Sequence, residues 1–140
     1  MSKGFSDWRG SLIILGAQSA KSIEFYKSMD FVGYGVDEDR IYNCDTGATI
    51  INPSSDTNHG YGVIVKARNN TAGSNGETAI LLGGFGVLGT EAAIHYFCLN
   101  IASLGKEFKK DYFSIVVKAR ITGGKETVTR VRGKTRRFHK

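Results

Sequence analysis

Proline, cysteine and long apolar runs are all scarce in this sequence. It contains one proline and two cysteines, Cys44 and Cys98, which lie far apart along the chain. That spacing excludes the C-x-x-C pairs of zinc ribbons and thioredoxin-type sites. The longest apolar run is far shorter than the roughly 18 residues that a membrane span needs. Residues 1–10 contain no apolar segment of the signal-peptide kind, so we expect a cytoplasmic protein with no membrane partner.

The positive charge is concentrated at one end of the chain. The 140 residues carry a net charge of +6, but residues 118–140 alone hold nine Lys or Arg and one acid, whereas residues 1–117 are slightly acidic. An apolar content of 41% is ordinary for a folded protein. We therefore predict one domain over residues 1–132 and a basic C-terminal tail over 133–140. Such a tail is either simply solvated or makes weak, non-specific contacts with nucleic acid.

Two segments read as a strand, a glycine turn and a helix. Residues 11–16 form an apolar run that predicts a strand buried on both faces, followed by a helix over 19–29. Residues 78–82 predict a second buried strand. Thr90 then predicts a helix N-cap and Gly105 its end. The apolar stripe of this second helix comprises Ile94, Phe97, Cys98, Ile101 and Leu104.

The remaining segments are rich in β-forming residues. Residues 40–43 and 48–51 flank a turn and predict a hairpin, and residues 61–68 predict a strand. Residues 113–121 and 126–132 flank a glycine turn and predict a C-terminal β-hairpin. Together with the two helical units, this order predicts an α/β domain with a mixed sheet. Both helical units are expected to be right-handed crossovers, with their glycine turns at the carboxyl edge of the sheet, where α/β folds bind ligands.

The most specific motif is Gly84-x-Gly86-x-x-Gly89, which stands between a predicted strand and a predicted helix. Glycines at this spacing permit a tight turn and let backbone amides approach a phosphate at the positive end of a helix. The acid that dinucleotide-binding domains carry after the next strand is missing, which argues against NAD. The alternative is that these glycines only let the helix pack closely.

A second turn, residues 16–22, resembles the end of a P-loop but lacks the glycine before its lysine. It reads better as a capped helix start. In that case the side chains of Gln18 and Ser19 help to line a cleft, or the turn is an ordinary one.

A family resemblance rests on the segment Gly83-Gly84-x-Gly86 with Gly89-Thr90-Glu91, which follows an apolar strand. It resembles the Gly-Gly-x-Gly-Thr-x-x-Glu motif of the SLOG superfamily. That superfamily comprises Rossmann-like domains related to cytokinin-activating phosphoribohydrolases, and it includes nucleotide sensors of prokaryotic signalling and defence. The resemblance implies a Rossmann-like fold and a nucleotide-derived ligand.

No catalytic triad and no metal cluster is readable. His59, His95 and His139 are the only histidines and are dispersed, whereas metal sites normally show clustered His, Cys or carboxylate ligands. We therefore predict a Rossmann-like α/β fold, a mixed sheet flanked by two main helices, that binds or senses a nucleotide-like or anionic small molecule. The alternatives are a nucleotide or nucleoside hydrolase that uses Glu91 and a protein-interaction domain with a nucleic-acid-contacting tail. The sequence leaves cofactors and oligomeric state open, a homo-oligomer included. The predicted ligand-binding residues are Gly16, Gln18, Ser19, Gly84, Gly86, Gly89, Thr90 and Glu91.

Overall fold

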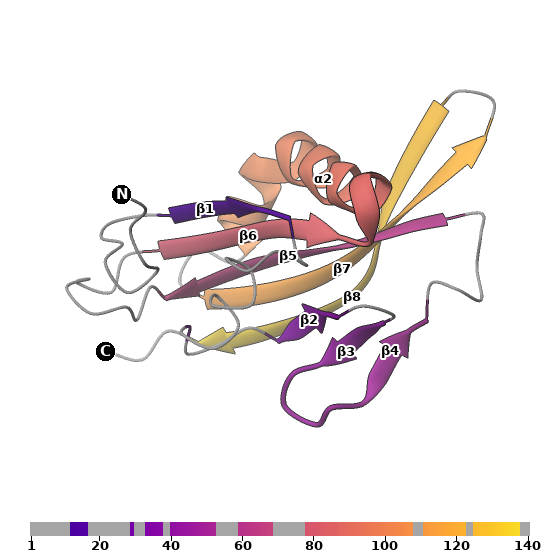
Figure 1. The fold of residues 1–140 in the computed structure, drawn as a ribbon. Helices are drawn as coiled ribbons and strands as arrows, with labels where there is room; N and C mark the ends of the chain where they lie inside the picture. The colour runs from indigo at the N-terminus through magenta and orange to yellow at the C-terminus, as the bar shows by residue number, and fades with distance from the viewer. Residues whose placement is uncertain are drawn as a thin grey trace, which may run out of the picture.

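The computed structural model has three layers: one helix, a five-stranded sheet and a three-stranded sheet (Figure 1). The helix covers one face of the larger sheet, and the smaller sheet lies against the other face. The structure describes residues 12–16, 29, 33–37, 40–52, 59–68, 78–107, 111–122 and 125–137.

The larger sheet is mixed but chiefly antiparallel. Its strand order is β1-β6-β5-β7-β8, and only the pair of β1 and β6 is parallel. Strands β6 and β7 both run antiparallel to β5, so they are parallel to each other and the helix crosses over β5 to join them. The elements are β1 (Leu12–Leu15), β5 (His59–Arg68), β6 (Thr78–Gly84), α2 (Gly86–Glu107), β7 (Asp111–Thr122) and β8 (Lys125–Arg137).

Alternation along β5 divides the apolar core between the two faces of the larger sheet. Val63 and Val65 point toward the smaller sheet, whereas Ile64 points toward α2. All three are fully buried because β5 is the central strand and both of its faces are covered. On the helix side, Ile64 packs with Ile115 and with the small residues Ala92 and Ala93 of α2.

The smaller sheet consists of β2 (Tyr34–Val36), β3 (Ile41–Asn43) and β4 (Thr49–Ile51), paired antiparallel in that order. Its side chains Tyr34, Val36 and Ile41 enter the core on this face. The backbone amide of Tyr34 also donates a buried 3.0 Å hydrogen bond to the hydroxyl of Ser114 on β7. The predicted hairpin over 40–43 and 48–51 is confirmed as β3 and β4.

The predicted fold class is wrong. We expected a Rossmann-like α/β domain, a mixed sheet flanked by two main helices, but one face of the sheet is covered by a second sheet, and α2 is the single helix among the described residues. The physical reason is the pairing of the short strands within residues 34–51. They form a separate antiparallel sheet whose apolar side chains cover one face of the larger sheet. The helix predicted over 19–29 lies outside the described residues, except for Met29.

The boundaries of α2 also differ from the prediction. The helix begins at Gly86 rather than after Thr90, and it continues through Gly105 to Glu107. Its buried residues are Ala92, Ala93 and Leu104, whereas two members of the predicted stripe, Cys98 and Ile101, are exposed. Because Ala92 and Ala93 are small, the helix axis lies close to the sheet. The buried face of α2 is therefore the one that packs most closely, and not the one with the largest apolar side chains.

The C-terminal hairpin is present as β7 and β8, and it is longer than predicted. β8 continues to Arg137, so the first residues of the predicted tail pair with the start of β7. The pairing shifts register between Val116 and Val117, which leaves Val131 as an extra residue on β8. Such a bulge bends and twists a strand pair, and Figure 1 shows the far end of the hairpin turning away from the sheet.

Strand β1 forms where residues 11–16 predict it, but it is not buried on both faces. Ile14 is 5% exposed, whereas Ile13 is 65% and Leu15 61% exposed. The cause is position: β1 is an edge strand of the larger sheet, and α2 packs mainly over β5 and β6. Ile14 points to the other face, into the core shared with the smaller sheet.

Neighbouring alanine substitutions in β1 test this orientation. Ile14→Ala should lower the free energy of unfolding by about 2–5 kcal/mol, because it leaves a cavity in a packed core. Ile13→Ala should cost about 1 kcal/mol or less, since only strand propensity is lost at an exposed position. Urea denaturation of both variants measures the difference, and equal losses would contradict the orientation of the strand.

Candidate functional site

The two predicted glycine turns meet at one edge of the larger sheet. Because β1 and β6 are parallel, their carboxyl ends lie together. The backbone amide of Gly16 donates a 2.8 Å hydrogen bond to the carbonyl of Leu82, which precedes Gly83 and Gly84. Gly16 has a φ of 98°, a conformation that favours glycine, and a methyl group added there would meet nothing within 4 Å.

The amino end of α2 lies at the same edge of the sheet. Phe85 donates its amide to the carbonyl of Tyr61 over 3.1 Å, and the amide of Gly89 donates to the carbonyl of Phe85 over 3.0 Å. The intervening amides of residues 86–88 belong to the first turn, where a helix offers no internal acceptor. The first turn contains no acidic residue, so no side chain of that turn offsets the positive end of the helix dipole.

Two glycines of the motif are in close contact with the protein's own backbone. A methyl group on either Gly84 or Gly89 would overlap the carbonyl oxygen of Tyr61, and one on Gly84 would also come within 2.6 Å of the Gly89 carbonyl carbon. Both residues are buried. Their missing side chains therefore let α2 approach β5 and β6, the alternative role considered for this motif.

The facing strand is matched to this approach. A methyl group on Gly62 would overlap the carbonyl oxygen of Gly89, and one on Gly60 would lie 2.5 Å from the Cγ of Leu88. Gly62 is also the register partner of Gly84 in the sheet. The glycines of β5 were not among the predicted functional residues, although the alternation His-Gly-Tyr-Gly at residues 59–62 is a signal that a second glycine-rich segment packs there.

The other predicted site residues are distributed as follows. Thr90 is half-buried in the second turn of α2, and Glu91, the next residue, is exposed. Gln18 and Ser19 lie outside the described residues. The structure thus brings Gly16, Gly84 and Gly86 to one edge of the sheet, and the roles in ligand binding predicted for these residues, for Thr90 and for Glu91 stay predictions.

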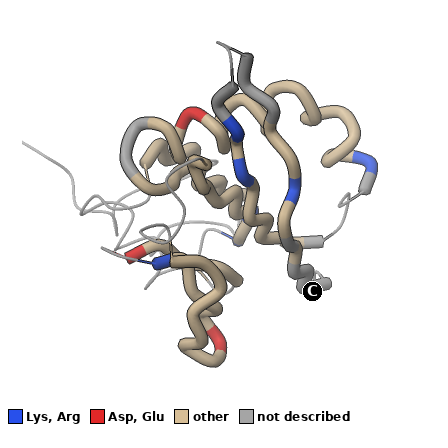
Figure 2. Tube along the Cα trace, turned by 90° about the vertical axis from the view of Figure 1, so that its right-hand side faces the viewer, with Lys and Arg blue, Asp and Glu red and all other residues tan. Residues whose placement is uncertain are grey.

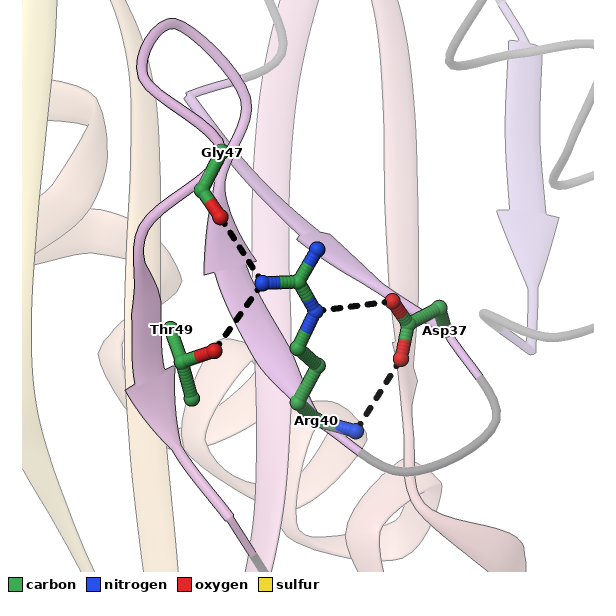
Figure 3. A network of polar contacts seen from close by, with 4 residues as sticks. All are labelled: Asp37, Arg40, Gly47 and Thr49. Carbon is green, nitrogen blue, oxygen red and sulfur yellow. Dashed lines mark hydrogen bonds and ion pairs between the residues drawn. The ribbon is translucent and has the colours of Figure 1, made fainter.

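A connected network of polar contacts lies in the smaller sheet (Figure 3). Arg40 Nε donates to the carboxylate of Asp37 over 3.0 Å, and the Arg40 backbone amide donates to the same carboxylate over 3.1 Å. The Nη1 atom of Arg40 donates to the Gly47 carbonyl and to the Thr49 hydroxyl, 2.7 and 2.9 Å away. One guanidinium therefore ties the start of β3 to the turn before β4.

Tyr42 lies beneath this guanidinium. The Arg40 Cζ atom lies 4.9 Å from the centroid of the Tyr42 ring, and a methyl group on Gly35 would come within 2.7 Å of that ring. Burial raises the pKa of the Tyr42 hydroxyl above its ordinary value, and the nearby Cys44 and Asp37 raise it further. The hydroxyl is therefore protonated at neutral pH, and the cluster acts as a structural clamp rather than as a source of a base.

Metal and thiol chemistry find little support in the described part of the chain. No group of three or more His, Cys, Asp or Glu side chains gathers there in a way that could hold a metal ion. Cys44 is half-buried and Cys98 exposed, and neither forms a disulfide. Within the same residues, no helix is both long enough and apolar enough to cross a membrane.

No family model, curated protein or solved structure matches the chain. The geometry of the described residues is therefore the basis on which function is inferred. Two parts of the described structure carry charge or hydrogen-bond donors without an intrahelical acceptor. One is the carboxyl edge of β1 and β6, and the other is the surface of β7 and β8.

Two glycines of α2 provide a matched test of the packing role. Gly89→Ala should lower the free energy of unfolding by about 1–3 kcal/mol, because the new methyl group meets backbone that has to shift. Gly105→Ala should raise it by up to about 1 kcal/mol, since a methyl group there meets nothing within 4 Å and alanine is the better helix former. Chemical denaturation measures both free energies of unfolding. An unchanged free energy in the Gly89→Ala variant would contradict the close approach of α2 to β5.

Proposed function

We propose that the chain is a binding module for a small anionic ligand of the nucleotide type, held at the edge where β1 and β6 end. The observation that carries this proposal is the hydrogen bond from the Gly16 amide to the Leu82 carbonyl. It holds Gly16, which follows β1, beside the end of β6, from which α2 begins. β1 and β6 are parallel, so their carboxyl ends lie at one edge of the sheet.

The chemistry of the edge favours a phosphate or carboxylate. The amides of residues 86–88 supply donors without an intrahelical acceptor, and the helix dipole places partial positive charge at the same point. No acidic residue occurs in the first turn to compete with an incoming anion. A methyl group added at Gly16 would meet nothing within 4 Å, so no described atom blocks the approach of a ligand to this residue.

The site residues divide into two roles in this proposal. Gly16 and the first-turn amides contact the ligand, with the hydroxyl of Thr90 as a further donor. Gly84 and Gly89 position the helix rather than contact the ligand, because their open faces are filled by backbone. Glu91 is exposed next to this turn and is assigned to a sugar hydroxyl. The resemblance to the SLOG motif supports a nucleotide-type ligand over a simple anion.

Substitution at Gly86 separates charge from bulk in this site. Gly86→Asp places a carboxylate in the first turn and should weaken binding of AMP and of inorganic phosphate by about fivefold or more, the effect expected of about 1 kcal/mol. Gly86→Asn has nearly the same size without the charge and should stay within about twofold of the unsubstituted chain. Isothermal titration calorimetry measures the three affinities.

Thermal unfolding of the same variants provides the control. Gly86→Asp should unfold at the same or a higher temperature than the unsubstituted chain, because a carboxylate near a helix amino end is stabilising. Weaker binding in a variant that is not less stable therefore reports on the site. Equal affinities of the Asp and Asn variants, or no binding of either anion to the unsubstituted chain, would overturn the proposal.

A further inference from the structure

A cationic strip runs across three strands of the larger sheet, at the end where β5 begins. Register places His59 of β5 beside Arg120 of β7, and Tyr61 beside Lys118. Lys118 in turn lies beside Thr129 of β8. The cationic strip consists of the two cations Lys118 and Arg120 together with their cross-strand neighbours His59 and Thr129.

The strip lies on the face of the sheet opposite to α2. Val116 is buried in the core under the smaller sheet, so Lys118 and Arg120, two and four residues further along the strand, point to the same side. Both side chains are exposed, as is Thr129. The smaller sheet is hydrogen-bonded to β7 at Ser114, nearer to the start of that strand.

No carboxylate neutralises the strip among the described residues. Neither Lys118 nor Arg120 makes an ion pair or a side-chain hydrogen bond there. Asp37 is engaged by Arg40, and Asp45 is at the tip of the hairpin between β3 and β4. Figure 2 shows Lys and Arg residues on neighbouring strands of the sheet.

The strip combines its cations with an aromatic group. The ring of half-buried His59 lies 6.1 Å from that of buried Tyr61, at 44° between the planes. Tyr61 thus supports one side of the His59 ring. Proteins bind single-stranded nucleic acid with two kinds of group: cations contact the phosphates, and aromatic rings stack on the bases. The strip provides both.

The spacing of the cations suits a chain of charges better than a single ion. Lys118 and Arg120 are two positions apart on an extended strand, which separates their Cα atoms by about 6.8 Å. They lie along the strand rather than converging on one point. The sequence extends the same charge, since residues 118–140 carry nine Lys or Arg against one acid.

We propose that the cationic strip binds the phosphate backbone of single-stranded nucleic acid, without base-specific readout, while His59 stacks on a base. The partner is a polyanion that follows β7 and meets β5 at its first residue. This proposal does not depend on the ligand site at the edge of β1 and β6, whose donors belong to the first turn of α2 and not to β7. Gly86→Asp should accordingly leave nucleic-acid binding unchanged within about twofold.

Charge-removing substitutions on the two faces of the sheet test the proposal. A labelled single-stranded oligo(dT) of 20 nucleotides is titrated with the protein by fluorescence anisotropy over a series of salt concentrations. Lys118→Gln and Arg120→Gln should each weaken binding about fivefold at 0.1 M salt and reduce the slope of log affinity against log salt by about 0.7. The matched control Lys106→Gln removes one exposed charge from the end of α2 and should change neither quantity.

His59→Ala addresses the stacking part of the proposal. It should weaken binding without changing the salt slope, because stacking releases no counterions. Equal effects of Lys106→Gln and Lys118→Gln would overturn the proposal, since they would show attraction to net charge alone. It would also be overturned if the strip variants bound the oligonucleotide normally but lost binding to phosphatidylserine vesicles or to polyglutamate.

Discussion

The fold depends on the close approach of α2 to β5 around the carbonyl group of Tyr61. This oxygen accepts the amide of Phe85 and lies against the Cα atoms of Gly84 and Gly89. An approach this close is possible only without side chains, because any Cβ would take the place of the carbonyl. It fixes where the helix starts and how it crosses β5. The position of β7 follows, since α2 leads directly into that strand.

Several elements could be predicted from the sequence because their pattern is local. The apolar runs at 12–15 and 78–82 and the alternating segments near the C-terminus form strands where we expected them. Strand direction could not be predicted in the same way. Whether residues 61–68 and 78–82 pair parallel or antiparallel depends on the connection between them, and the apolar runs themselves suit both arrangements. The Rossmann-like prediction failed because the local pattern of residues 34–51 indicates strands but not the second sheet that they form against one face.

The functional surfaces show the same division. The glycine motif is recognisable in the sequence. Its contacts with Tyr61 are not, because Tyr61 belongs to β5 and lies more than twenty positions earlier in the chain. Similarly, the sequence indicated a basic C-terminal end but not which cations share a face. His59 and Arg120 become neighbours only through the pairing of β5 with β7. Long-range register therefore decides both the ligand edge and the cationic strip.

The glycines at 60 and 62 have a consequence for reading other sequences. A phosphate-binding loop needs glycine on its own segment alone, because its counterpart is a ligand. A helix seated directly on a sheet needs small residues on both partners, and here every second residue of β5 at the contact is glycine. Two glycine-rich stretches in one short domain are thus a mark of helix docking. A search that evaluates each stretch separately would predict a cofactor site where two segments of the protein's own backbone pack against each other.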